Sequence, residues 1–90
     1  MATNEDTRTF NPMAYDVLLE LATRIGGQYV AWAEEAPSEA SGRHWRNAGI
    51  EMQRQVRAVD PHSRSAIESK TEELRAMLAT MPAHAPLLTA

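Results

Sequence analysis

The chain has 90 residues, of which 43% are hydrophobic and 23% are charged, and its net charge is −3. This composition is typical of one small folded domain and excludes an intrinsically disordered chain. Cysteine is absent, which excludes disulfides, zinc–thiolate sites and iron–sulfur clusters. No apolar run approaches the roughly 20 residues of a membrane-spanning helix, and the polar, acidic start does not resemble a secretory signal. We therefore expect a cytoplasmic protein.

Five prolines divide the chain, because proline is tolerated in the first turn of a helix and stops a helix elsewhere. They stand at positions 12, 37, 61, 82 and 86. We expect a single helical domain over residues 1–90, with a flexible N-terminal arm (1–10), three helical segments (11–36, 38–60 and 61–81) and a tail (82–90).

The first segment opens with a helix-start signal, since Asn11 suits an N-cap and Pro12 suits the first helical position. Apolar residues then recur at three- and four-residue steps, which predicts a helix. These residues are Leu18, Leu21, Ala22, Ile25, Tyr29, Trp32, Ala33 and Ala36. The adjacent Gly26 and Gly27 cost a helix about 2 kcal/mol relative to alanine. We predict one long helix with a soft point there, and a bend or a break into two shorter helices is the alternative.

The other two segments have the same helical spacing. The inward face of residues 38–60 is Trp45, Ala48, Gly49, Met52, Val56 and Val59, and that of residues 61–81 is Ser63, Ile67, Thr71, Leu74, Leu78 and Met81. Either Ser38 or Ser41 suits the N-cap of the second helix, and Asp60, followed by Pro61, suits that of the third. Because the connections are about two to five residues long, neighbouring helices should be antiparallel. The predicted fold class is all-α, a small three-helix up-down-up bundle.

No residue pattern indicates catalysis or a bound cofactor. The three histidines, His44, His62 and His84, do not share a helix at the spacing of metal ligands. The double glycine lacks the residues that complete a phosphate-binding loop, and no nucleophile elbow is present. We therefore predict a protein that is not an enzyme and holds no metal and no cofactor.

Charge is distributed unevenly along the chain. Residues 1–40 have a net charge of −5, residues 41–65 of +3 and residues 66–90 of −1. On a helical wheel, four arginines and one isoleucine of the second helix fall within about 80°, on the side opposite its core residues. We call this set the arginine stripe: Arg43, Arg46, Ile50, Arg54 and Arg57. The first helix carries an acidic stripe on its outer face, formed by Asp16, Glu20 and Glu34.

The arginine stripe admits three interpretations. It is a solvated face with one incidental apolar residue, a surface for a protein partner or for a second copy in a homodimer, or a surface for nucleic acid. We predict a protein-interaction or regulatory module that binds through the stripe. A nucleic-acid-binding regulator, such as a small repressor or antitoxin-like protein, is the alternative. Arginine outnumbers lysine eight to one, which codon bias in a GC-rich genome also explains.

The tail ends with two leucines, Leu87 and Leu88. We expect it to fold back over the open end of the bundle, because a free apolar tail is a liability for a small protein. The alternative is that the leucines are presented to a partner.

Overall fold

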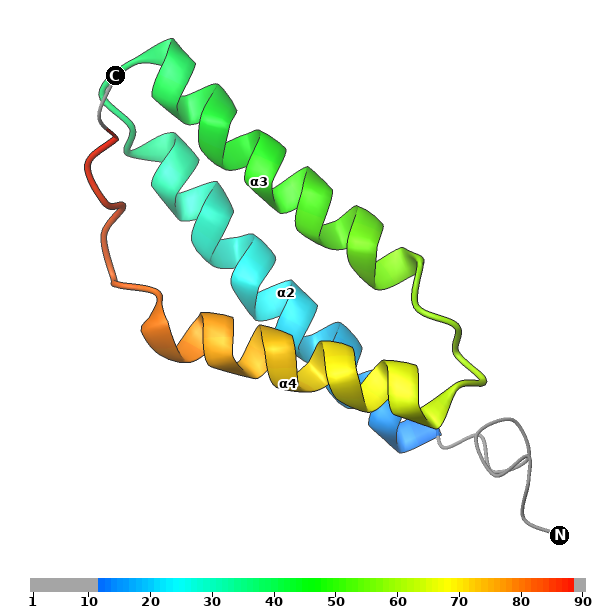
Figure 1. Cartoon of the computed structure of the whole chain (residues 1–90). Coiled ribbons are helices and arrows are strands. Elements are labelled where there is room, and N and C mark those ends of the chain that lie inside the picture. The colour runs from blue at the N-terminus through cyan, green and yellow to red at the C-terminus, as the bar shows by residue number, and fades with distance from the viewer. Residues whose placement is uncertain (1–11, 89–90) are drawn as a thin grey trace, which may run out of the picture.

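Three helices make up the fold. The computed structural model describes residues 12–88, and these contain α2 (Pro12–Glu34), α3 (Glu39–Arg57) and α4 (Arg64–Thr80) with no strand among them (Figure 1). The predicted all-α, up-down-up bundle is confirmed. The expected N-terminal arm and the Asn11 cap lie outside the described residues. None of the three helices combines the length and apolarity that a membrane span requires.

The central element is α2, which packs against both α3 and α4, whereas α3 and α4 hardly contact each other. In Figure 1, α4 diverges from α3 toward its C-terminal end, so one side of the bundle is left open. One polar contact joins α4 to α3 and another joins α4 to α2. Lys70 Nζ donates to Gln55 Oε1 at 3.1 Å, and the Tyr29 hydroxyl lies 4.0 Å from Met77 Sδ.

α2 runs without interruption through its double glycine. Gly26 faces α3, where a Cβ atom would stand 3.3 Å from Gln53 Nε2, while Gly27 is exposed with nothing within 4 Å of the same position. Ile25 before the glycines and Trp32 after them are both buried. Burial of each large apolar side chain contributes roughly 1.5–3 kcal/mol, which outweighs the helix penalty of about 2 kcal/mol. The predicted continuous helix is confirmed, and the break is not.

Both serines that suited the start of α3 take part in its cap. Ser38 is the N-cap, and its side chain accepts a hydrogen bond from the backbone N–H of Ser41 at 3.1 Å. The Ser38 N–H in turn donates to Ser41 Oγ at 3.3 Å, which completes a capping box.

The prediction that Asp60 caps the third helix is wrong. The N-cap of α4 is Ser63, whose side chain accepts from the Ala66 N–H at 3.2 Å. Asp60 instead closes the preceding turn: its Oδ1 accepts from the His62 N–H at 2.9 Å and its carbonyl accepts from the Ser63 N–H at 3.0 Å. Because the carboxylate is used in this local turn, α4 begins at Arg64, three residues later than predicted. At the other end of the connection, α3 ends at Arg57 rather than at residue 60.

The core consists of two hydrophobic clusters. The larger one joins all three helices and contains Leu18, Ala22, Ile25, Met52, Val56, Ile67 and Leu74. The smaller one lies toward the α2–α3 connection and contains Trp32, Ala33 and Trp45, with Tyr29, Ala48, Met81 and Ala85 packed against it. All of these residues except Ala85 belong to the inward faces that the helical spacing predicts.

The tail folds back, as predicted, over the smaller cluster. Gln28 Nε2 donates to the carbonyl oxygens of Pro82 and Ala83, both at 3.0 Å. Glu35 Oε1 accepts from the Ala85 N–H at 3.3 Å and lies 3.4 Å from His84 Nδ1. Beyond these contacts Leu87 is 94% exposed and Leu88 is 42% exposed, so the tail covers the aromatic residues without burying either of its leucines.

Candidate functional site

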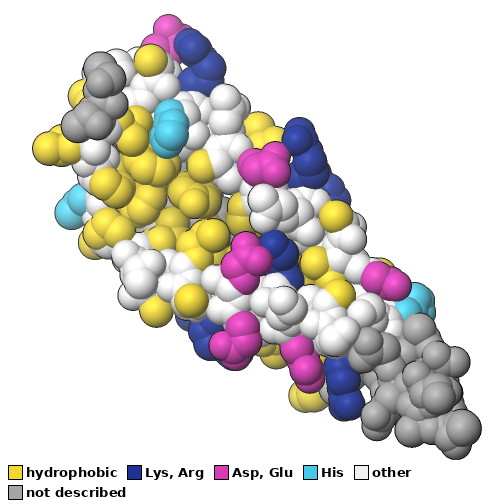
Figure 2. Space-filling view, viewed as in Figure 1, with side chains coloured by type: hydrophobic (Ala, Val, Ile, Leu, Met, Phe, Trp, Pro, Cys, Tyr) yellow, Lys and Arg dark blue, Asp and Glu magenta, His cyan; other side chains and the backbone are white. Residues whose placement is uncertain are grey.

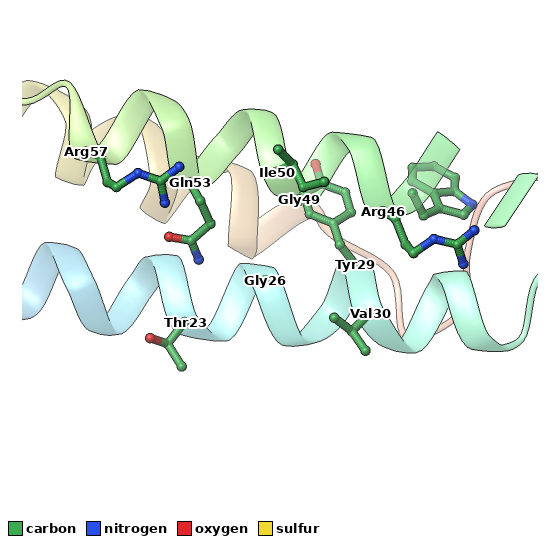
Figure 3. Close-up of a pocket in the computed structure, with 10 residues that line it drawn as sticks. Thr23, Gly26, Tyr29, Val30, Arg46, Gly49, Ile50, Gln53 and Arg57 are labelled. Atoms are coloured by element: carbon green, nitrogen blue, oxygen red, sulfur yellow. The ribbon is translucent and has the colours of Figure 1, made fainter. Parts of the chain in front are cut away.

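A surface groove of about 540 Å³ runs between α2 and α3. α2 contributes Thr23, Gly26, Tyr29 and Val30, and α3 contributes Trp45, Arg46, Gly49, Ile50, Gln53 and Arg57 (Figure 3). Among the described residues, none from α4 lines it. The groove therefore belongs to the α2–α3 hairpin alone.

Two glycines form the floor of the groove. Gly26 and Gly49 present backbone where other residues would place a side chain, and a Cβ atom on Gly49 would stand 3.5 Å from Tyr29 Cβ. The two helices therefore lie close together at these glycines, and the surface between them is recessed because no side chain fills it. The Tyr29 ring stacks on Trp45, with ring centroids 6.1 Å apart and planes inclined by 18°, and closes one end of the floor.

Large apolar side chains are exposed on both sides of the groove. Ile50 of α3 is 55% exposed and Val30 of α2 is 54% exposed. Leu19, at 39%, extends the apolar surface along α2, because Leu19, Gly26 and Val30 follow one another at helical spacing on one face. Scattered exposed apolar residues are common, but here two of them line a single groove and a third continues along the same face of α2.

Arginines flank the apolar centre on α3. Figure 3 shows Arg46 and Gln53 extending from α3 toward α2 on either side of Ile50, with Arg57 one turn beyond Gln53. Neither Arg46 nor Arg57 has an ion pair or a side-chain hydrogen bond with any residue from 12 to 88. Two guanidinium groups that lack an internal partner therefore lie beside exposed apolar surface.

The structure divides the predicted arginine stripe into two parts. All five members are exposed on α3, and Figure 2 shows basic side chains along the outer edge of this helix. Arg46, Ile50 and Arg57 line the groove, whereas Arg43 and Arg54 lie outside it. Arg54 is already paired, since its Nη1 lies 3.0 Å from Glu51 Oε1.

Sequence reasoning missed the half of the groove that α2 supplies. Val30 and Thr23 lie outside the apolar face of α2, and nothing in a single helix indicates that they meet α3. The available signal was the glycine pair, since a glycine on each helix of an antiparallel hairpin favours close approach. On the adjoining outer face of α2 the acidic stripe is exposed, and Glu34 has no ion pair among the described residues.

A second apolar surface lies on the open side of the bundle. Figure 2 shows hydrophobic side chains gathered between α3, the C-terminal half of α4 and the tail. Trp32 and Trp45 meet edge to face there, with ring centroids 4.7 Å apart, and both are almost fully buried. The Trp32 Nε1–H is buried and has no hydrogen-bond partner in the part of the chain that the structure describes. Because Ala85 of the tail packs against this cluster and both indole rings are buried, the cluster is part of the core rather than an open site.

No set of three His, Asp or Glu side chains between residues 12 and 88 is placed to hold a metal ion. Comparisons with known proteins give no relative: no family model, no curated protein and no solved structure matches the chain.

Proposed function

We propose that this protein is a non-enzymatic interaction module that binds another protein surface through the α2–α3 groove. The observation that carries the proposal is the exposed apolar centre of the groove, Ile50 and Val30, flanked by Arg46 and Arg57, which form no ion pair with any residue from 12 to 88. Protein interfaces commonly combine a small apolar anchor with arginine, and they are depleted in lysine. A cytoplasmic location is part of this proposal, and fractionation of the cells that encode the protein tests it.

The groove favours a helical partner with acidic ends. Its floor of two glycines accepts protruding side chains, and its apolar centre buries the apolar face of a helix. The arginines stand about 11 residues apart on α3, which is about 16 Å along the helix axis. A partner helix with carboxylates about three turns apart therefore meets both guanidinium groups.

Nucleic acid is the less favoured ligand. Phosphates laid along α3 would meet Glu51, which is paired with Arg54, and Glu34 on the adjoining face of α2. These carboxylates repel a polyanion, and affinity for nucleic acid is dominated by the neutralisation of phosphate charge.

Site-specific photo-crosslinking in the cells that encode the protein tests the proposal. A photoreactive amino acid at position 50 should form covalent adducts with protein, while the same residue at position 76, exposed on α4, should not. Adding Ile50→Glu to a chain with the probe at position 30 should abolish the adducts, and Ala76→Glu, which adds the same charge elsewhere, should leave them intact. Equal crosslinking at positions 50 and 76, or adducts with nucleic acid alone, would overturn the proposal.

A further inference from the structure

We infer that the occupant of the α2–α3 groove is the same face of a second copy of this chain, with α2 of each copy lying over α3 of the other. This inference rests on the proposed function and names its partner. It requires a two-fold axis that runs along the groove, parallel to the two helices. The interface is then a four-helix arrangement in which each helix has antiparallel neighbours.

The charges on the two helices suit this arrangement. The charged residues that line the groove are two cations of α3, Arg46 and Arg57, and α2 lines it with no charged residue. The adjoining outer face of α2 carries three exposed carboxylates, Asp16, Glu20 and Glu34, and one cation, Arg24, which is loosely paired with Glu20. A rotation that places α2 over α3 therefore sets unlike charges opposite each other along both seams. The other simple rotation, about an axis across the groove, places α2 over α2 and α3 over α3, where like charges meet and repel.

The heights of the charges along the helices also agree. A two-fold rotation about an axis parallel to the helices does not change the position of a residue along that axis. Contacts between α2 and α3 within one copy therefore also show which residues face each other between the two copies. Ala33 and Ala36 lie against Gly42, which places Glu34 level with the turn that holds Arg43 and Arg46. In the dimer, Glu34 of one copy therefore faces these two arginines of the other.

The second charged pair follows at the opposite end of the groove. Gly26 lies against Gln53, Glu20 precedes Gly26 by six residues, and Arg57 follows Gln53 by four. At 1.5 Å per residue, Glu20 and Arg57 lie within about 3 Å of each other in height. Within residues 12–88 the ion-pair partner of Glu20 is Arg24, at 3.7 Å, and both side chains of that loose pair are largely exposed.

Apolar residues fill the space between the two charged pairs. Tyr29 lies against Gly49, so the positions of Val30 and Ile50 along the helix axis differ by only about two residues. In the dimer, Val30 of one copy therefore meets Ile50 of the other. The shared apolar area is small, because only Leu19, Val30 and Ile50 are prominently exposed there. A small apolar centre with charged ends makes an association that depends strongly on salt.

Charge-reversal variants of the full chain test the pairing. Arg46→Glu with Arg57→Glu places carboxylates on both sides of each proposed charged pair, and Glu20→Arg with Glu34→Arg places cations on both sides. Each double variant should self-associate about 100-fold more weakly than the unmodified chain, whereas an equimolar mixture of the two should form a heterodimer, because both seams regain unlike charges. Analytical ultracentrifugation measures the association, and circular dichroism confirms that the helices are intact.

The absence of cysteine from the chain allows a test of the geometry. A mixture of Val30→Cys and Ile50→Cys chains should form the mixed disulfide in excess of the half that random pairing gives, and high salt should remove the excess. Disulfides mainly between identical positions would overturn the axis along the groove. A mixture of charge-reversed variants that stays monomeric would overturn self-pairing altogether.

Failure of this inference is distinguishable from failure of the proposed function. If the unmodified chain is monomeric but a probe at position 50 crosslinks to a different protein, self-pairing is wrong and the groove remains an interaction surface. If no protein adduct forms at position 50, the proposed function is wrong as well.

Discussion

Glycines decide how closely α2 and α3 approach, and the four in the chain are not equivalent. Gly42 lies under α2, where a Cβ atom would stand 3.3 Å from the carbonyl oxygen of Ala33. That oxygen belongs to the backbone of a helix and cannot move aside independently. Gly27, on the same hairpin, has open space where its side chain would stand.

These two positions should therefore respond oppositely to the same substitution. Gly27→Ala should raise the free energy of unfolding by about 0.5–1 kcal/mol, because alanine favours the helix and meets no neighbour. Gly42→Ala should lower it, since the methyl group pushes α3 away from α2. Urea unfolding followed by circular dichroism compares the two variants, and an equal gain at both positions would show that the hairpin is not closely packed at Gly42.

At the scale of single residues the sequence identified the arginines but not which of them share a surface. Wheel positions group Arg43 and Arg54 with the others, yet only Arg46 and Arg57 border the groove with Ile50. The difference depends on where α2 lies, and no property of α3 alone specifies that. The pairing of Arg54 has a different, local origin, because Glu51 lies three residues before it on α3 and forms an ion pair with it.

Among the elements, helix existence followed from apolar spacing and helix ends depended on competing caps. Ser38 and Ser41 both suited the start of α3, and the structure uses them together in one capping box. Asp60 was the predicted cap of α4, but the local turn holds Asp60, and the cap is Ser63, which the helical spacing had placed on the inward face. Short polar side chains near a helix start bind backbone groups in more than one geometry, so spacing alone does not choose between them.

The tail is a distinct element with a measurable role in the core. It covers Trp32 and Trp45 through Ala85 and is held by the side chains of Gln28 and Glu35. Removing residues 82–90 should shift the tryptophan fluorescence to longer wavelength, because water then reaches the indole rings. The free energy of unfolding should fall by about 1 kcal/mol as apolar contact is lost.

A matched substitution separates this effect from the loss of tail leucines in general. Leu87→Ser, at a side chain that is 94% exposed, should leave both the emission maximum and the stability unchanged. Unaltered emission after removal of residues 82–90 would show that the tail does not protect the aromatic cluster in solution.

The whole molecule is a hairpin with a third helix on one side, and its two faces are used differently. α4 and the tail cover the α2 surface that carries the core, while the groove side of the same hairpin has no covering element among residues 12–88. The sequence predicted the fold class, since three apolar stripes and short connections leave few arrangements. It did not predict the groove, which arises only when the hairpin brings Gly26 beside α3 and Gly49 beside α2.

The measurement that bears most directly on the groove as a self-pairing surface is the molar mass of the full chain by light scattering after size exclusion. At high micromolar concentration we expect a dimer in about 0.1 M salt and a monomer in about 1 M salt, where the screening length falls from about 10 Å to about 3 Å. The Ile50→Glu chain should be monomeric in both solutions and equally helical. A monomeric unmodified chain at low salt, or a dimer that neither salt nor Ile50→Glu dissociates, would contradict self-pairing through the groove.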